Sequence, residues 1–227
     1  MRAMILAAGR GARMRSLTRD RPKPLLAVGG RPLIEWQIQR LRSAGISDLV
    51  INTGWHGDAL RAAIGDGRRL GVSVDWSDEG WPALETAGGI RRALPLLGPD
   101  PFLVVNADLW CDFDLGRLEG LKSDADAHLV LVDNPPHHPD GDFALDGDRV
   151  AAVGAPKLTY SGIGVFRPAP FESLPDGALP LRPVLDAAIA AERVTGERHD
   201  GTWMDIGSPE RLAELDEMMG GTEGARD

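Results

Sequence analysis

Cysteine is nearly absent from this chain, since Cys111 is the only one among 227 residues. A single thiol excludes an internal disulfide, a cysteine zinc cluster and an iron–sulfur site. Long apolar runs are also absent, because the longest are short and are interrupted by glycine or proline. No segment is therefore expected to span a bilayer. The first residues lack the charged, apolar and cleavage regions of a signal peptide, so we expect a cytoplasmic protein.

Positive charge is in the minority, with 25 Lys and Arg against 34 Asp and Glu and a net charge of −9. A nucleic acid or an anionic membrane would require a broad basic face, so neither partner is expected, and no protein partner is assigned. Residues 1–31 nevertheless hold eight basic side chains and one acid, Asp20: the bases are Arg2, Arg10, Arg13, Arg15, Arg19, Arg21, Lys23 and Arg31. This local concentration predicts a site for a compact polyanion such as a triphosphate.

Short apolar runs alternate with helical patterns in the first half, which is typical of a parallel sheet covered by helices. The expected strands there are residues 4–8, 49–52, 72–76 and 102–105, and the expected helices are residues 32–44, 58–64 and 86–94. After residue 127 the strands at 128–132, 143–145, 150–153 and 160–166 are separated by turns, and helices follow at 181–191 and 209–219. We predict a single α/β domain over 1–227, with halves at 1–126 and 127–219 and a frayed tail at 220–227.

The apolar run at 4–8 opens into Gly9-x-Gly11. Met14 stands where a dinucleotide fingerprint has its third glycine, and no Gly-Lys-Ser/Thr occurs, so neither that fingerprint nor a Walker loop is present. Glycine at both positions lets backbone N–H groups approach phosphate oxygens, and Arg13 can add a two-pronged contact. The alternative is a solvated arginine-rich turn, which is less favoured because crowded like charges repel unless an anion neutralises them.

Lysine is rare, with 22 arginines against only three lysines, Lys23, Lys122 and Lys157. Lys23 stands in a rigid Pro22-Lys23-Pro24 frame, which indicates a need for a compact ammonium rather than a planar fork. The alternative is an ordinary lysine on an exposed turn.

Residues 6–14, Leu-Ala-Ala-Gly-Arg-Gly-Ala-Arg-Met, followed by Pro22-Lys23-Pro24, resemble the signature of the sugar-1-phosphate nucleotidylyltransferases. The resemblance implies a Rossmann-like, three-layer α/β fold of the GT-A-like type with a mixed, mostly parallel central sheet. It implies that a nucleoside triphosphate is bound by Ala8, Gly9, Gly11, Ala12, Arg13 and Lys23. In that family Arg13 would stabilise the departing pyrophosphate, and Lys23 would bridge the nucleotide and the sugar phosphate.

Two aspartates are candidate metal ligands. Asp108 closely follows the carboxyl end of the most apolar strand, and ligands gather at such strand ends in open α/β sheets. Asp205 lies between a short strand and a helix. A turn role for Asp108 and a capping role for Asp205 are the alternatives, although Ser208 is the better cap. Two carboxylates facing a triphosphate are expected to bind Mg²⁺, and both segments resemble the metal-binding places of the family.

Residues 85–89, Glu-Thr-Ala-Gly-Gly, open a helix with small side chains and leave room for a flat base, although close helix–sheet packing would explain them equally. The family resemblance implies that Glu85, Gly88 and Asn106 contact the nucleotide. Asp142 and Gly162 are the candidates for the sugar pocket. We place His137 and His138 on a loop and assign them no metal.

Residues 84–90, 132–138 and 141–143 are similar to one bacterial subgroup, the uridylyltransferases of N-acetylmuramate 1-phosphate, which act in peptidoglycan recycling. This implies that UTP and a sugar 1-phosphate react to give a UDP-sugar and pyrophosphate. A mannose- or heptose-1-phosphate guanylyltransferase and a non-catalytic nucleotide-sensing domain are the alternatives.

Overall fold

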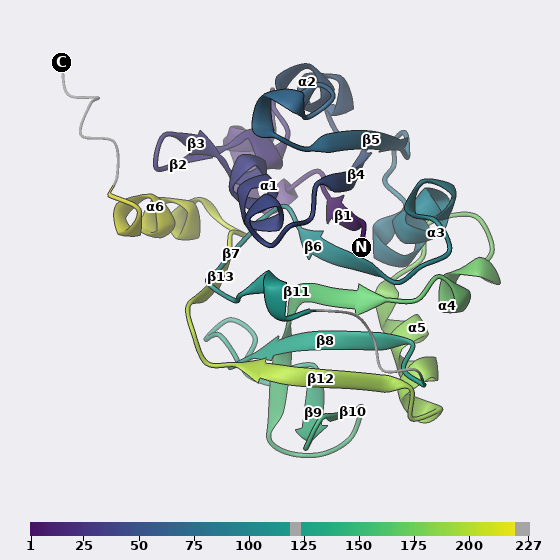
Figure 1. Cartoon of the computed structure of the whole chain (residues 1–227). Helices are drawn as coiled ribbons and strands as arrows, with labels where there is room; N and C mark the ends of the chain where they lie inside the picture. The colour runs from purple at the N-terminus through teal and green to yellow at the C-terminus, as the bar shows by residue number, and fades with distance from the viewer. Residues whose placement is uncertain (119–123, 221–227) are drawn as a thin grey trace.

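A mixed nine-stranded sheet forms the centre of the computed structural model, which describes residues 1–118 and 124–220 (Figure 1). Its strands are, in spatial order, β5 (Ser73–Asp78), β4 (Asp48–Thr53), β1 (Ala3–Leu6), β6 (Phe102–Asn106), β11 (Lys157–Phe166), β8 (Ala127–Val132), β12 (Val194–His199), β10 (Arg149–Ala151) and β9 (Phe143–Asp146). The pairings reverse direction only at β11 and β10, so the other seven described strands point the same way. The predicted mixed, mostly parallel sheet is confirmed.

The two faces of the sheet carry separate apolar clusters. Along β1, Ala3 and Ile5 pack on one face with α1 (Leu33–Ser43) and α2 (Gly57–Ile64), whereas Met4 packs on the other face with α3 (Glu85–Leu97). Alternate side chains of a strand point to opposite faces, so a strand that is apolar throughout is covered on both. The short helix α4 (Ala169–Glu172) and α5 (Leu181–Ala190) join the α3 face. The result is the predicted three-layer α/β architecture.

Parallel order in the first half follows from its helices. Each of α1, α2 and α3 returns the chain across the sheet between parallel strands, as a βαβ unit requires. The carboxyl ends of β1, β4, β5 and β6 consequently lie at one edge. Side chains that follow these strands are thereby brought together, although up to a hundred residues separate them in the chain.

Two small antiparallel ribbons lie outside the main sheet. One pairs β2 (Ala27–Val28) with β3 (Arg31–Pro32), and the other pairs β7 (Leu109–Cys111) with β13 (Trp203–Asp205). The last helix, α6 (Pro209–Met218), begins at the predicted cap, where Ser208 Oγ accepts from the backbone N–H of Arg211 at 3.4 Å. It packs through Leu215 against Met14, Leu33 and Ile206. This packing brings the last helix against the N-terminal loop.

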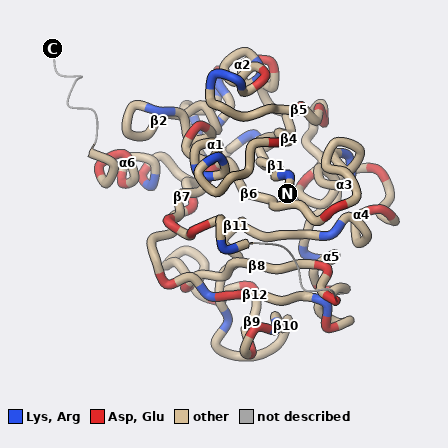
Figure 2. Tube along the Cα trace, in the orientation of Figure 1, with Lys and Arg blue, Asp and Glu red and all other residues tan. Residues whose placement is uncertain are grey.

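Short 3₁₀ turns complete the described chain: η1 (Ala12–Thr18), η2 (Lys23–Leu25), η3 (Arg68–Leu70) and η4 (Leu115–Arg117). Both signs of charge are distributed over both halves of the trace (Figure 2). Among the described helices, none is long and apolar enough to cross a membrane. Of the predicted frayed tail only Gly220 is described, so residues 221–227 lie outside the described residues.

Candidate active site

A cavity of about 240 Å³ opens at the carboxyl ends of the parallel strands. It is lined by the loop after β1, by residues that end or follow β4, β5 and β6, and by the start of α3: the lining residues are Leu6, Ala7, Ala8, Gly9, Gly11, Lys23, Pro24, Asn52, Glu79, Ala83, Glu85, Thr86, Asn106, Ala107 and Asp108. This is where open α/β sheets bind ligands. Six predicted nucleotide-binding residues belong to the lining: Ala8, Gly9, Gly11, Lys23, Glu85 and Asn106.

The glycine loop is shaped around the stem of Lys23. Gly11 has φ +63°, and a Cβ placed on it would lie 3.0 Å from Cβ and Cδ of Lys23. Only a residue without a side chain fits both this left-handed backbone and this contact. The Thr18 hydroxyl donates to the Gly11 carbonyl at 3.1 Å, which ties the loop to η1. The loop is thus held in one shape by its own residues.

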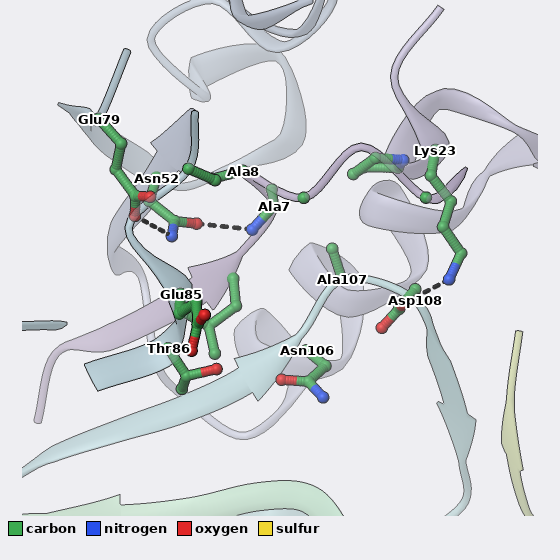
Figure 3. Close-up of a pocket in the computed structure, with 15 residues that line it drawn as sticks. Ala7, Ala8, Lys23, Asn52, Glu79, Glu85, Thr86, Asn106, Ala107 and Asp108 are labelled. Atoms are coloured by element: carbon green, nitrogen blue, oxygen red, sulfur yellow. Dashed lines mark hydrogen bonds and ion pairs between the residues drawn. The ribbon is translucent and has the colours of Figure 1, made fainter. Parts of the chain in front are cut away.

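Lys23 and Asp108 form an ion pair inside this cavity (Figure 3). Only 7% of the Lys23 side chain is exposed, against 40% of the Asp108 side chain. A nearly buried ammonium requires a charged or polar partner, and here the carboxylate supplies it. The reading of Lys23 as an exposed turn lysine is therefore wrong. Its charge is directed into the cavity from η2.

A second polar network supports the opposite side of the cavity (Figure 3). Asn52 Oδ1 accepts from the Ala7 backbone N–H at 2.6 Å, and Asn52 Nδ2 donates to Glu79 Oε1 at 2.6 Å. Glu79 Oε2 accepts from the Leu84 N–H at 2.8 Å. Burial raises the pKa of Glu79, although the bonds from Leu84 and Asn52 oppose that shift. The network joins β4, β5 and the turn before α3 to the strand that opens into the glycine loop.

Asp205 is brought to the neighbourhood of Asp108 by the β7–β13 ribbon. Asp205 pairs with Leu109, the residue after Asp108, and the Ile206 N–H donates to the Asp108 carbonyl at 2.8 Å. The two candidate metal ligands, 97 positions apart in the chain, therefore stand on adjacent backbone segments. Asp205 is itself the last residue of the short strand predicted to precede it.

Basic side chains surround Asp205. Its carboxylate forms an ion pair with Arg211 of α6, and His137 Nε2 lies 3.0 Å from its Oδ1. A Cβ placed on Gly207 would lie 2.9 Å from Asp205 Oδ2 and 3.1 Å from Arg13 Nη2. Arg13 therefore extends from η1 to the start of α6 and does not line the cavity described above. His137 is one of the basic side chains around Asp205.

Two further predicted nucleotide-binding residues also lie outside the cavity lining. Ala12 begins η1. Gly88 faces the loop before α5, because its N–H is 3.2 Å from the Leu179 carbonyl and a Cβ on it would collide with the Gly177 carbonyl oxygen. Close packing of α3 against this loop explains the small residue at position 88.

The predicted sugar-binding residues occupy two different environments. Asp142 uses both oxygens within the protein, accepting from the Tyr160 N–H at 2.8 Å and lying 3.1 Å from His138 Nε2. Gly162 has φ +82°, and a Cβ on it would lie 2.5 Å from Nδ2 of Asn106, a cavity residue. It sits at the irregularity in the β11–β8 register between Tyr160 and Gly164. Gly162 therefore packs against a residue of the cavity lining, whereas Asp142 anchors the loop that precedes β9.

Sequence reasoning did not identify Asn52, Glu79, His137 or Arg211 as site residues. Asn52 and Glu79 had a usable signal, because each is a polar residue at or just after the end of a predicted strand. His137 and Arg211 had no such signal in the sequence, since their neighbours come from distant segments.

The chain matches one known family. Residues 2–143 match the family model described as Nucleotidyl transferase, and the chain belongs to that family. The chain is 48% identical to the N-acetylmuramate alpha-1-phosphate uridylyltransferase of Neisseria meningitidis serogroup B, over 97% of this chain and 99% of the relative. It is 34% identical to the enzyme of the same name from Caulobacter vibrioides, over 92% of each.

A solved structure supports the fold. The inositol-1-phosphate CTP transferase from T. maritima superposes with a TM-score of 0.79 over 100% of this chain and 98% of that one, at 20% identity. At that identity the likeness concerns the fold alone.

Proposed function

We propose that this protein transfers a uridylyl group from UTP to N-acetylmuramate 1-phosphate, releasing a UDP-sugar and pyrophosphate. The observation that carries the proposal is the convergence of the glycine loop, Lys23 and Asp108 on one cavity. The 48% identity to the Neisseria relative over nearly the full length of both chains supports this choice of nucleotide and sugar. We further infer a role in peptidoglycan recycling in the cytoplasm.

The reaction requires little covalent chemistry from the protein. An oxygen of the sugar phosphate attacks the α-phosphorus of UTP, the bond from that phosphorus to the bridging β-phosphate oxygen breaks, and pyrophosphate leaves. The second pKa of a phosphate monoester is about 6, so the nucleophile is already largely a dianion at neutral pH. No general base is required. Catalysis then consists of positioning and charge neutralisation.

Lys23 is suited to reduce repulsion between the two anionic substrates. Its ammonium already lies in the cavity beside Asp108, and its stem is held between the glycine loop and η2. A compact, rigidly placed charge stabilises developing negative charge without reorganising during the reaction. Arg13 is proposed to stabilise the departing pyrophosphate from the η1 side.

Asp108 and Asp205 are proposed to hold a Mg²⁺ ion. Hard carboxylate oxygens on adjacent backbone segments fit this ion, which retains open positions for phosphate and water. When bound, the ion would act as a Lewis acid at the α-phosphate. In its absence, Lys23 and Arg211 compensate the two negative charges.

The test is a pyrophosphate-release assay with UTP, GTP and CTP, each combined with N-acetylmuramate, N-acetylglucosamine, mannose and heptose 1-phosphates. We expect the highest kcat/KM for UTP with N-acetylmuramate 1-phosphate. A preference for GTP with mannose or heptose 1-phosphate would replace this assignment with a guanylyltransferase. Absence of pyrophosphate release with every pair would favour a non-catalytic nucleotide-binding domain.

A further inference from the structure

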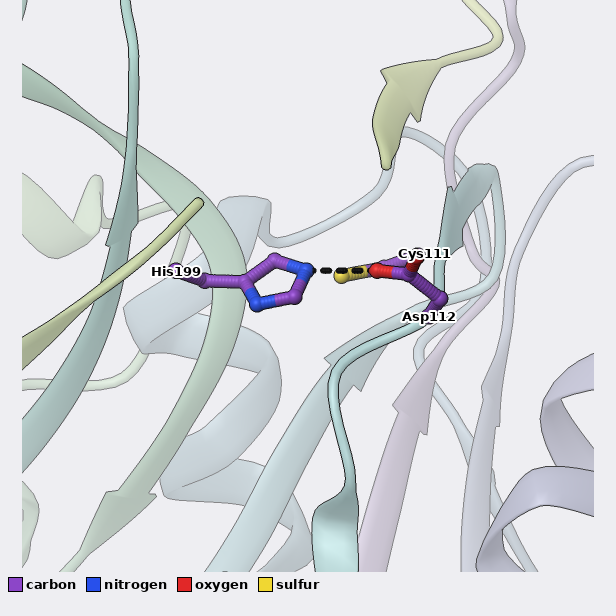
Figure 4. A group of neighbouring side chains, drawn as sticks. All are labelled: Cys111, Asp112 and His199. Carbon is purple, nitrogen blue, oxygen red and sulfur yellow. Dashed lines mark hydrogen bonds and ion pairs between the residues drawn. The ribbon is translucent and has the colours of Figure 1, made fainter. Parts of the chain in front are cut away.

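Three potential metal ligands of different chemistry meet at the end of the β7–β13 ribbon that is remote from Asp108. Cys111 ends β7, Asp112 follows it, and His199 ends β12. Their ligand atoms all lie within 4.8 Å of one another, and His199 Nε2 is 2.7 Å from Asp112 Oδ1. Figure 4 shows the imidazole directed toward the thiol sulfur and the carboxylate.

This donor set has a definite metal preference. A thiolate sulfur, an imidazole nitrogen and a carboxylate oxygen suit Zn²⁺, whereas Mg²⁺ prefers oxygen alone. Ordinary zinc bond lengths place the donor atoms of a tetrahedral site about 3.3 to 3.6 Å apart. The distances between the three donor atoms in this structure therefore need to change by only about 1 Å to match a zinc site. The single cysteine excludes a cysteine cluster but is compatible with a site of three mixed ligands.

The geometry points to a zinc site formed by Cys111 Sγ, Asp112 and His199 Nε2, with a fourth position open to water. The site is separate from the proposed Mg²⁺ site and does not depend on the proposed function. A thiolate and a carboxylate together balance the two positive charges of the ion, and a neutral imidazole completes the set.

Neighbouring groups hold these ligands in place. The Asp112 N–H donates to the Thr202 carbonyl at 3.1 Å, and the ring of Phe113 packs edge-on against His199 with centroids 5.4 Å apart. Cys111 is buried, whereas 53% of the Asp112 side chain is exposed. An ion would therefore enter from the exposed Asp112 side and reach the buried thiol of Cys111 last.

Arg40 lies beside the cluster but does not occupy it. The guanidinium of Arg40 donates to Gln37 Oε1 at 2.9 Å and to the Phe113 carbonyl at 3.2 Å. Burial raises the pKa of the Cys111 thiol, and the positive charge of Arg40 acts in the opposite direction. Because a metal binds the thiolate form, metal binding would release the thiol proton into solvent.

The position of the site gives it a structural purpose. It would join the end of β7 to the end of β12, and the chain runs from His199 through a short turn into β13 and Asp205. Strands rise about 3.3 Å per residue, so Leu109, the residue after Asp108, lies roughly 7 Å from Cys111 along β7. Zinc at this point would fix the ribbon that carries both proposed Mg²⁺ ligands.

Cobalt provides the probe, because a thiolate bound to Co²⁺ gives a near-ultraviolet charge-transfer band that oxygen ligands do not give. The full-length protein, freed of metal by chelation and kept in excess Mg²⁺, is titrated with Co²⁺ and then with Zn²⁺. We expect the band to saturate at one equivalent of Co²⁺, to disappear when Zn²⁺ displaces it, and to be accompanied by release of a proton. Zn²⁺ should also raise the unfolding temperature.

Variants assign the ligands. Cys111→Ser should abolish the band, and His199→Gln or Asp112→Asn should weaken Co²⁺ affinity at least about tenfold. Asp200→Asn serves as the matched control, because Asp200 is an exposed carboxylate next to His199 that pairs with Arg198 at 2.8 Å, and it should bind as the wild type does. Asp108→Asn should also retain the band.

Either of two results overturns the site: the absence of a band from the wild-type protein, or unchanged Co²⁺ affinity in both His199→Gln and Asp112→Asn. The last two variants alter partly exposed side chains, so they decide the question even if Cys111→Ser does not fold.

Discussion

Individual acidic side chains in the candidate site are already matched with cations. Asp108 pairs with Lys23 at the cavity, and Asp205 pairs with Arg211 beside α6. An arriving nucleotide with its metal ion would exchange these internal partners for phosphate and metal contacts. The charges that the proposed reaction requires are therefore in place before the substrates bind.

Asp108→Asn and Asp205→Asn are expected to lower kcat at least about a hundredfold in Mg²⁺, the scale of a lost electrostatic contact at the reacting group. Each amide keeps the size of the side chain but removes the charge that is proposed to hold the ion. Steady-state pyrophosphate release measures the effect, and circular dichroism checks the fold. Asp66→Asn, at an exposed carboxylate paired with Arg68, should keep the wild-type rate. Near-normal turnover in both site variants would remove the metal assignment.

Gly11→Ala is expected to destabilise the protein by about 1 to 2 kcal/mol, the cost of a left-handed backbone for a residue with a Cβ. The new methyl group would also press on the stem of Lys23. Gly9→Ala is the matched change, because nothing lies within 4 Å of a Cβ at that position, and its unfolding free energy should stay near that of the wild type. Urea denaturation measures both. Equal stability of the two variants would contradict the strained geometry of position 11.

Among the secondary-structure elements, the network of Asn52 and Glu79 links β4, β5 and the turn into α3 to the strand before the glycine loop. Such a network makes the position of the glycine loop depend on the packing of β4, β5 and the turn into α3. The ion pairs of the site join Lys23 of η2 to Asp108, which directly precedes β7, and Arg211 of α6 to Asp205 of β13. Rigid strands thus set the position of the glycine loop.

Glu79 should make stability depend on pH. Its pKa is raised above the ordinary value of 4.5, so the folded protein holds this proton more tightly than the unfolded chain does. The associated stability is fully present below about pH 4.5 and is lost as pH rises through the folded-state pKa. The side chain of the Glu79→Gln variant cannot ionise. The unfolding free energy of the variant should therefore increase relative to that of the wild type as pH rises from 4 to 7. A difference that stays constant over this range would contradict the raised pKa.

Elements with an apolar run or a helical periodicity could be predicted from the sequence, whereas strands without such a pattern could not. Apolar runs such as residues 102–105 are strands by composition, and the helix periodicity and the Ser208 cap are local signals. β12 (Val194–His199) was missed because its sequence is largely polar, and it becomes a strand only through its parallel pairing with β8. The short strand before Asp205 was predicted, but its partner β7 (Leu109–Cys111) was missed, because it forms only through its pairing with β13.

At the scale of the whole molecule, binding of UTP should stabilise the fold, since the cavity draws on four strands and α3. Mass action predicts about 2.7 kcal/mol of added stability at a ligand concentration one hundred times the Kd. Thermal unfolding with increasing UTP in Mg²⁺ measures this gain. Lys23→Ala should show a much smaller shift at the same concentrations. Equal shifts in the two proteins would exclude Lys23 from nucleotide binding.

The sequence by itself determined the alternating α/β pattern, the chemistry of the glycine loop and the family to which the chain belongs, because these depend on residues close together in the chain. Only the tertiary structure decided which distant side chains meet: Lys23 with Asp108, Asp205 with His137 and Arg211, and Cys111 with His199. The physical reason is that strand order and ribbon pairing arise from contacts between segments far apart in the chain, and no local pattern encodes them.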